Sequence, residues 1–170
     1  YNLARPGALA RGAYRRLLPR LAAFGVIASP FFIALGGLGW GWWPLNIMFT
    51  LFVAAAVLWL LEVRSSSAIA GAIVLFLVGG LFVEFWWPAL ACIVAAWLYC
   101  RRATWLRFVG WIAATGSLYL INDNLWALAA LPALFLLAHV SVTLPRMRWL
   151  FYLFYPAHLA VLWVIRELIF

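Results

Sequence analysis

A histidine stands in the middle of a long apolar stretch, Phe151 to Arg166, which reads FYLFYPAHLAVLWVIR. An ionisable side chain at bilayer depth costs free energy, so it is a candidate for function. A histidine titrates near neutrality, which suits a general base, a proton relay or a haem ligand. On helical spacing His158 shares a face with Leu162 and Arg166, and Tyr155 lies one turn before it. The stretch therefore predicts a polar stripe on an apolar helix.

Pro156 lies between these two groups. It donates no backbone hydrogen bond, and its ring disturbs the carbonyl four residues back, at Tyr152. We therefore expect a bend beside His158 that frees a hydrogen-bond acceptor there. The alternative for His158 is a hydrogen bond between helices that aids packing only. Tyr152 and Tyr155 could donate to a substrate carbonyl, although such tyrosines more often serve packing.

Arginine supplies all twelve basic residues, and the formal net charge is +8. Beyond the N-terminal cluster, the densest group is Arg101, Arg102 and Arg107. These three could dock the phosphates of a cytoplasmic cofactor; the alternative is that they mark topology and contact anionic lipid. Glu84 and Asp123 are interpreted as solvated turn residues that could instead meet a cationic acceptor such as an amine.

The motifs of common soluble enzymes do not occur: the sequence has no phosphate loop, GxSxG, HExxH or CxxC. Cys92 and Cys100 are interpreted as packing residues, and no metal-ligand spacing exists. We therefore expect no metal site.

The composition predicts an all-α, polytopic transmembrane helix bundle. Of 170 residues, 69% are hydrophobic and 9% charged, whereas soluble domains have about 45–50% and about 25%. Twelve tryptophans fit aromatic belts at two membrane interfaces. About seven spans are expected, near residues 21–38, 45–61, 68–85, 88–100, 106–121, 125–140 and 149–165.

The arginines predict the topology of these spans. If the first cluster is cytoplasmic and the spans alternate, every loop with arginine falls on the cytoplasmic side and every arginine-free turn on the other. Eleven of the twelve arginines then obey the positive-inside rule, and only Arg166 does not. His158 then lies about nine residues, or about 14 Å, from the cytoplasmic end of its helix, near the bilayer centre. Since the arginines stand in short loops, we do not assign them to nucleic acid.

Neither a repeat nor a linker divides the sequence, so we expect a single membrane domain over residues 1–170. Residues 5–20 form its basic cytoplasmic segment and could be an amphipathic surface helix. The sequence begins with YNLARPG, which is typical of the exit of a helix. We therefore expect an N-terminally truncated domain with one or two more spans upstream.

Five blocks of the sequence together resemble one family: YNLAR at the start, GWGWWPLNIMFTL (39–51), VEFWWPALA (83–91), NDNLWALAALP (122–132) and FYLFYPAHLAVLWVIR (151–166). The chain is similar to the TraX family, integral inner-membrane proteins associated with N-acetylation of F-type conjugative pilin. The resemblance runs over nearly the whole chain, and the FYxFYPxH block is its most specific part.

This resemblance implies a multi-pass acetyltransferase of the bacterial inner membrane, with N-acetylation favoured. The donor would be cytoplasmic acetyl-CoA, and the acceptor the N-terminal amine of a pilin subunit. His158, with Tyr155 and Pro156, matches the family's C-terminal motif, and we expect it to act as a base or to orient the substrate. The arginines at 101, 102 and 107 would face the acetyl-CoA phosphates. The family also carries an Asp-His pair in its first membrane helix, which this sequence does not include.

Three other functions remain open. The same helices would serve an O-acyltransferase that modifies a cell-envelope glycan or lipid. A small transporter or proton-coupled channel could use His158 and Arg166 in its path. A haem-binding membrane anchor could use His139 and His158, although their different depths disfavour a shared ligand pair.

Overall fold

The computed structural model describes residues 2–37, 42–140 and 149–169. These residues form an all-helical structure, in which the one β contact is an isolated parallel bridge between Leu45 and Val83. The helices of the described ranges are α1 (Ala13–Ala34), α2 (Ile47–Val63), α3 (Ser66–Gly80), α4 (Trp86–Arg101), α5 (Trp105–Gly116), α6 (Tyr119–Asn122), α7 (Trp126–Ala138) and α8 (Leu150–Ile169).

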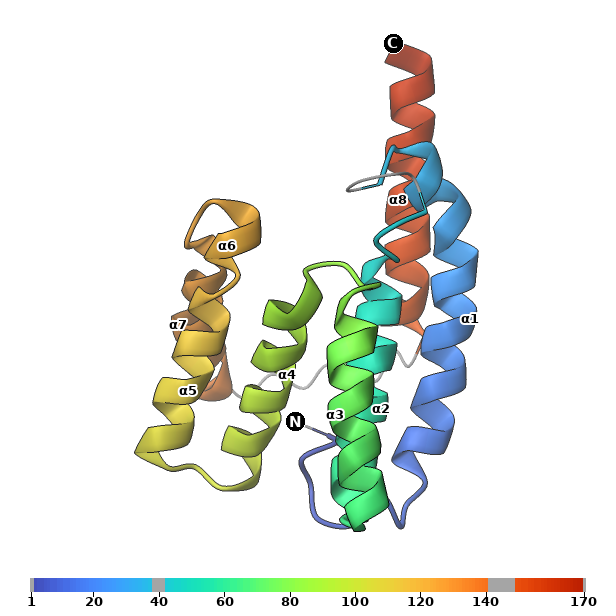
Figure 1. The fold of residues 1–170 in the computed structure, drawn as a ribbon. Coiled ribbons are helices and arrows are strands. Elements are labelled where there is room, and N and C mark those ends of the chain that lie inside the picture. The colour runs from blue at the N-terminus through green and yellow to red at the C-terminus, as the bar shows by residue number, and fades with distance from the viewer. Residues whose placement is uncertain (1, 38–41, 141–148, 170) are drawn as a thin grey trace.

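Helix α2 is the centre of the arrangement and packs against α1, α3 and α4. On one side α8 packs against α1, and on the other α5 joins α4 and α7 joins α5. Consecutive long helices run in opposite directions (Figure 1). Figure 1 also shows that α7 and α8, although neighbours in sequence, stand on opposite sides of the bundle.

Local sequence explains where several helices begin. The Asn46 side chain accepts a hydrogen bond from Met48 N and caps α2. The hydroxyls of Ser65 and Thr104 cap α3 and α5 in the same way. Such side chains satisfy backbone donors that have no partner within the helix.

Each of the seven apolar runs contains a helix, as predicted. Helix α1 ends at Ala34 and α3 at Gly80, before the expected ends at 38 and 85. The run at 106–121 is divided, because α5 ends at Gly116 and the short α6 begins at Tyr119. The Ser117 hydroxyl, which donates to Ala114 O at 2.7 Å, lies at this break. Competition of this kind for backbone carbonyls disfavours a continuous helix.

Two of the described helices, α1 with 22 residues and α8 with 20, are long and apolar enough to cross a membrane. The apolar helices α2, α3 and α7 are shorter than the roughly 20 residues that a bilayer needs. Membrane crossing is thus supported for two helices by length and composition, and the seven spans stay a prediction.

The basic segment 5–20 is not a separate surface helix, so that expectation is wrong. Its residues from Ala13 onward are the first turns of α1, and the residues before them form turns. Gly7 and Gly12 adopt left-handed backbone conformations, with φ of 73° and 63°, which interrupt a helix. The turns pack under the bundle, where Ala8 is fully buried near Trp97.

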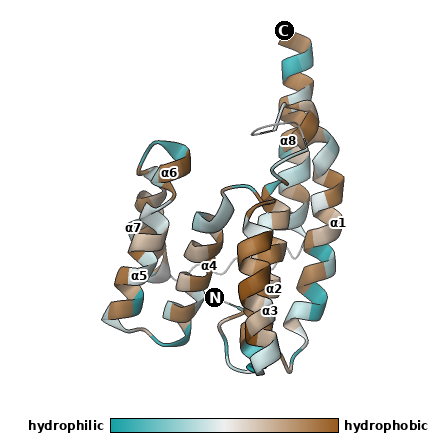
Figure 2. Ribbon diagram, viewed as in Figure 1, coloured by the Kyte–Doolittle hydropathy of each residue, from teal (hydrophilic) through white to brown (hydrophobic). Residues whose placement is uncertain are grey.

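The loops of the bundle lie at its two ends. Figure 1 shows the start of α1, the α2–α3 turn and the α4–α5 turn at one end, and the α3–α4 turn and α6 at the other. The described loops that hold arginine thus share one end, which we call the arginine end, as the alternating topology predicts. Arg146 and Arg148 lie outside the described residues. Hydrophobic residues cover most of α2 and α3 between these ends (Figure 2).

Candidate functional site

Glu84 lies in the turn between α3 and α4, at the end opposite the arginine end. Its backbone is held against the start of α2 by Glu84 N, which donates to Leu45 O at 2.9 Å. The Thr50 hydroxyl donates to Glu84 O at 3.0 Å, and Leu45 N donates to Phe82 O at 2.7 Å. These hydrogen bonds fix the turn, and therefore Glu84, at the N-terminus of α2.

Asn46 joins this turn to α1. Its side chain is 1% exposed, and its Nδ2 donates to Gly25 O at 2.9 Å and to Ser29 Oγ at 3.1 Å. Its Oδ1 accepts from Met48 N at 3.1 Å. One buried amide thus caps α2 and positions α1 beside the same helix end.

The Glu84 carboxyl is in an unusual environment. Its Oε2 is buried and has no hydrogen-bond partner among the described residues. Burial raises the pKa of Glu84 to about 7, although the backbone N–H of Ile47 favours the charged form. From α8, Tyr155 lies within electrostatic reach of this carboxyl and faces the same Ile47 N–H. We call Glu84, Asn46, Ile47, Thr50 and Tyr155 the Glu84 site.

The interpretation of Glu84 as a solvated turn residue is wrong. The bridge between Leu45 and Val83 draws the turn inward, and Val83 is fully buried. The sequence held a signal for this, since Glu84 stands between Val83 and Phe85, whereas Asp123 stands between two asparagines. Asp123 is exposed, as predicted.

Helix α8 separates the two groups expected to act together. Tyr152, Pro156 and Leu159 are buried, and Tyr155 is half-buried on the same side. This side packs against α1 and the start of α2. His158 is exposed, and its ring stacks on that of Phe154 with centroids 5.7 Å apart. The structure thus places Tyr155 within electrostatic reach of Glu84 and leaves His158 on the exposed side, where its catalytic role stays a prediction.

An apolar cavity of about 570 Å³ is lined in part by residues that follow Glu84 closely in the sequence. It is bounded by α3, by the start of α4 and by the segment around α6. Its lining residues are Phe76, Trp86, Trp87, Pro88, Ala91, Ser117, Leu120 and Ile121.

The predicted phosphate-binding arginines lie together at the arginine end, but two of them make internal contacts. Arg101 Nη1 is 3.5 Å from Glu62 Oε1, and its guanidinium lies over the Trp97 ring at 4.7 Å. Arg107 Nη1 donates to Leu98 O at 2.8 Å, near the last turn of α4. Arg102 is exposed. Phosphate binding by this cluster stays a prediction.

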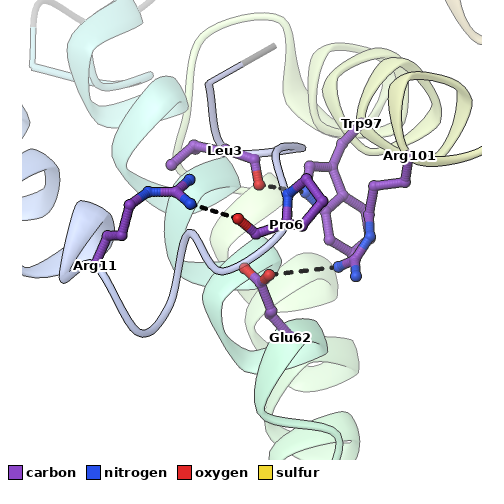
Figure 3. A network of polar contacts seen from close by, with 6 residues as sticks. All are labelled: Leu3, Pro6, Arg11, Glu62, Trp97 and Arg101. Atoms are coloured by element: carbon purple, nitrogen blue, oxygen red, sulfur yellow. Dashed lines mark hydrogen bonds and ion pairs between the residues drawn. The ribbon is translucent and has the colours of Figure 1, made fainter.

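The N-terminal turns cover the pair formed by Glu62 and Arg101 (Figure 3). Trp97 Nε1 donates to Leu3 O at 3.2 Å, and Arg11 donates to Pro6 O. The Glu62 side chain is only 10% exposed. The ion pair is therefore part of the packing that closes the arginine end.

The two ends are well separated. Helix α2 runs between them with 17 residues, which at a rise of about 1.5 Å corresponds to about 25 Å. His139, which follows α7, and His158 of α8 are also far apart, because these two helices stand on opposite sides of the bundle (Figure 1). A haem shared by these two histidines within one chain is therefore disfavoured.

Comparison with known families assigns the chain. The family described as TraX protein matches residues 1–166, a range that includes the whole Glu84 site and His158. Searches of curated proteins and of solved structures gave no match. Since the match covers nearly the whole chain, this protein belongs to the TraX family, which is involved in the processing of conjugative pilin.

Proposed function

We propose that this protein is an integral membrane acetyltransferase that moves an acetyl group from cytoplasmic acetyl-CoA to the N-terminal amine of a pilin subunit. The observation that carries this proposal is the Glu84 site. Burial there raises the pKa of the Glu84 carboxyl to about 7, and Tyr155 of the FYxFYPxH block lies within electrostatic reach of it. Acid–base groups of this kind suit acyl transfer to an amine.

The donor is expected at the arginine end, because the phosphates of acetyl-CoA are polyanionic and arginine binds phosphate well. Arg15, Arg16 and Arg102 are exposed there. Arg101 and Arg107 stabilise the α4–α5 turn through their internal contacts and would add positive charge near these exposed arginines.

The acceptor is expected at the opposite end, where the described turns carry acids and no arginine. The apolar cavity there could receive an apolar part of the pilin subunit. Tyr155 would donate a hydrogen bond to the thioester carbonyl. His158, on the exposed side of the same helix, would act as a base or orient the acceptor that docks along α8.

Intact-mass analysis of pilin subunits tests this function, with the gene present, deleted, and carrying His158→Ala. We expect one acetyl group on the N-terminal residue, lost on deletion and lost in His158→Ala although that protein still inserts. Full acetylation in His158→Ala would remove His158 from the mechanism and leave the function intact.

An unchanged pilin mass would overturn the proposed acceptor. The envelope glycans and lipids of the same strains would then be compared, because the same helices could acylate a hydroxyl. Loss of an acyl group from one of them on deletion would establish the O-acyltransferase alternative.

A further inference from the structure

We propose that Glu84 is the residue that takes the proton from the acceptor amine, an assignment that rests on the proposed function. The inference starts from the unpartnered Oε2, which is buried at a fixed position. An ammonium group that entered there would supply the missing donor, since a buried carboxylate oxygen without a partner is costly.

The surroundings of Glu84 leave this carboxyl as the proton-accepting group. Tyr155 of α8 lies within electrostatic reach of it, and the backbone N–H of Ile47 at the start of α2 donates to it. The Thr50 hydroxyl, which is uncharged, donates to the Glu84 backbone carbonyl. Among the described residues, no arginine lowers the pKa of Glu84. The incoming amine would therefore bring a positive charge that no arginine supplies at Glu84.

Two observations favour Glu84 over His158. The histidine is exposed and stacked on Phe154, whereas the Glu84 turn is fixed by backbone hydrogen bonds. Moreover, a carboxyl with an ordinary pKa is too weak a base for an ammonium, and burial removes this limit by raising the pKa to about 7. His158 can then orient the acceptor without taking its proton.

The step balances as follows. The Glu84 carboxylate takes one proton from the acceptor ammonium, which frees the lone pair on nitrogen. Nitrogen then forms a bond to the thioester carbonyl carbon, the carbon–sulfur bond breaks, and its electron pair leaves on sulfur. A second proton from nitrogen neutralises the thiolate. The products are the amide, free CoA thiol and a protonated Glu84, which returns its proton to water.

The test compares two acceptor peptides in membranes that contain the full-length protein and acetyl-CoA. One has the N-terminal sequence of the mature pilin with its α-amine, which is largely protonated at neutral pH. The other carries an aminooxy group instead, whose nitrogen is already neutral and needs no base. Glu84→Gln is compared with wild type, with Glu84→Asp, and with Asp123→Asn as a control for an exposed acid at the same end.

We expect Glu84→Gln to lower kcat/KM for the α-amine peptide by at least about 100-fold and to leave the aminooxy peptide nearly unaffected. Glu84→Asp should restore part of the rate, and Asp123→Asn should change neither. Since the base is active as a carboxylate, wild-type kcat/KM for the α-amine peptide should fall as the pH drops below about 7.

Two results would overturn the assignment. One is an unchanged rate with the α-amine peptide in Glu84→Gln; the other is an equal loss with both peptides, which would indicate structural damage. A wild-type protein that acetylates neither peptide would overturn the proposed function and, with it, the role of Glu84. The two failures are thus distinguishable.

Discussion

At the scale of single residues, Asn46 is the side chain on which the Glu84 site depends. It is fully enclosed, and each of its polar atoms has a partner in α1 or α2. A buried amide with satisfied hydrogen bonds stabilises one arrangement, because any other leaves polar groups unpaired. Glu84 itself is positioned by the backbone of the turn, which meets α2 directly beside Asn46.

We therefore predict that Asn46→Ala lowers the free energy of unfolding by about 2–4 kcal/mol, since it removes a helix cap and leaves buried groups unpaired. Asn124→Ala is the matched control: Asn124 Oδ1 also accepts from the backbone N–H two residues on, at Trp126, but Asn124 is exposed. That change should cost less than about 1 kcal/mol. Denaturation of both variants in detergent measures the difference, and equal losses would contradict the role of Asn46.

At the scale of helices, the close approach of α3 and α4 determines where the Glu84 turn lies. Gly80 ends α3, and a Cβ there would lie 2.6 Å from Trp87 Nε1. The Trp87 ring cannot easily move away, because Nε1 donates to Leu77 O at 3.0 Å. The glycine is needed for space, and the turn that carries Glu84 connects the two helices at this contact.

Gly80→Ala should therefore destabilise the protein by about 1–3 kcal/mol, as overpacking does, and should also reduce pilin acetylation by displacing the turn. Gly110→Ala is the control, because nothing lies within 4 Å of a Cβ at Gly110 in α5. Alanine is the better helix former, so that variant should be neutral or gain up to about 1 kcal/mol. Melting temperatures of the two variants would show the contrast; a stable Gly80→Ala protein would mean that the helices adjust.

At the scale of the whole molecule, the common end of the described arginine loops predicts how the protein lies in a membrane. The arginine end should be cytoplasmic, as the positive-inside rule requires. The Glu84 site would then open toward the opposite face, where a pilin subunit could arrive.

Cysteine labelling in intact cells measures this orientation. In a variant with Cys92 and Cys100 replaced by alanine, a membrane-impermeant maleimide added from outside the inner membrane should label Asn124→Cys and not Ser66→Cys. The two positions are exposed at opposite ends of the bundle, and Ser66 should react only after the membrane is opened. Labelling of both from one side would contradict the alternating topology.

Much of the fold could be predicted from local patterns, because each apolar run is longer than a strand and α2, α3 and α5 begin at side-chain caps. Asn46 and Ser65 mark two of the helix starts. The positions of the arginines predicted which loops share an end. For Glu84 the local signal was limited to its apolar neighbours, because its burial results from contact of the turn with Leu45, a residue far away in the sequence.

The sequence by itself therefore determined the helical class, the helix positions, the common end of the described arginine loops and the family to which the chain belongs. These follow from side-chain type and spacing within single segments. Only the tertiary structure decided that Tyr155 faces inward and His158 outward, that Arg101 pairs with Glu62, and that Glu84 lies within electrostatic reach of Tyr155. The physical reason is that burial of a polar group depends on the neighbouring helices, and a helical repeat does not specify which of its faces they cover.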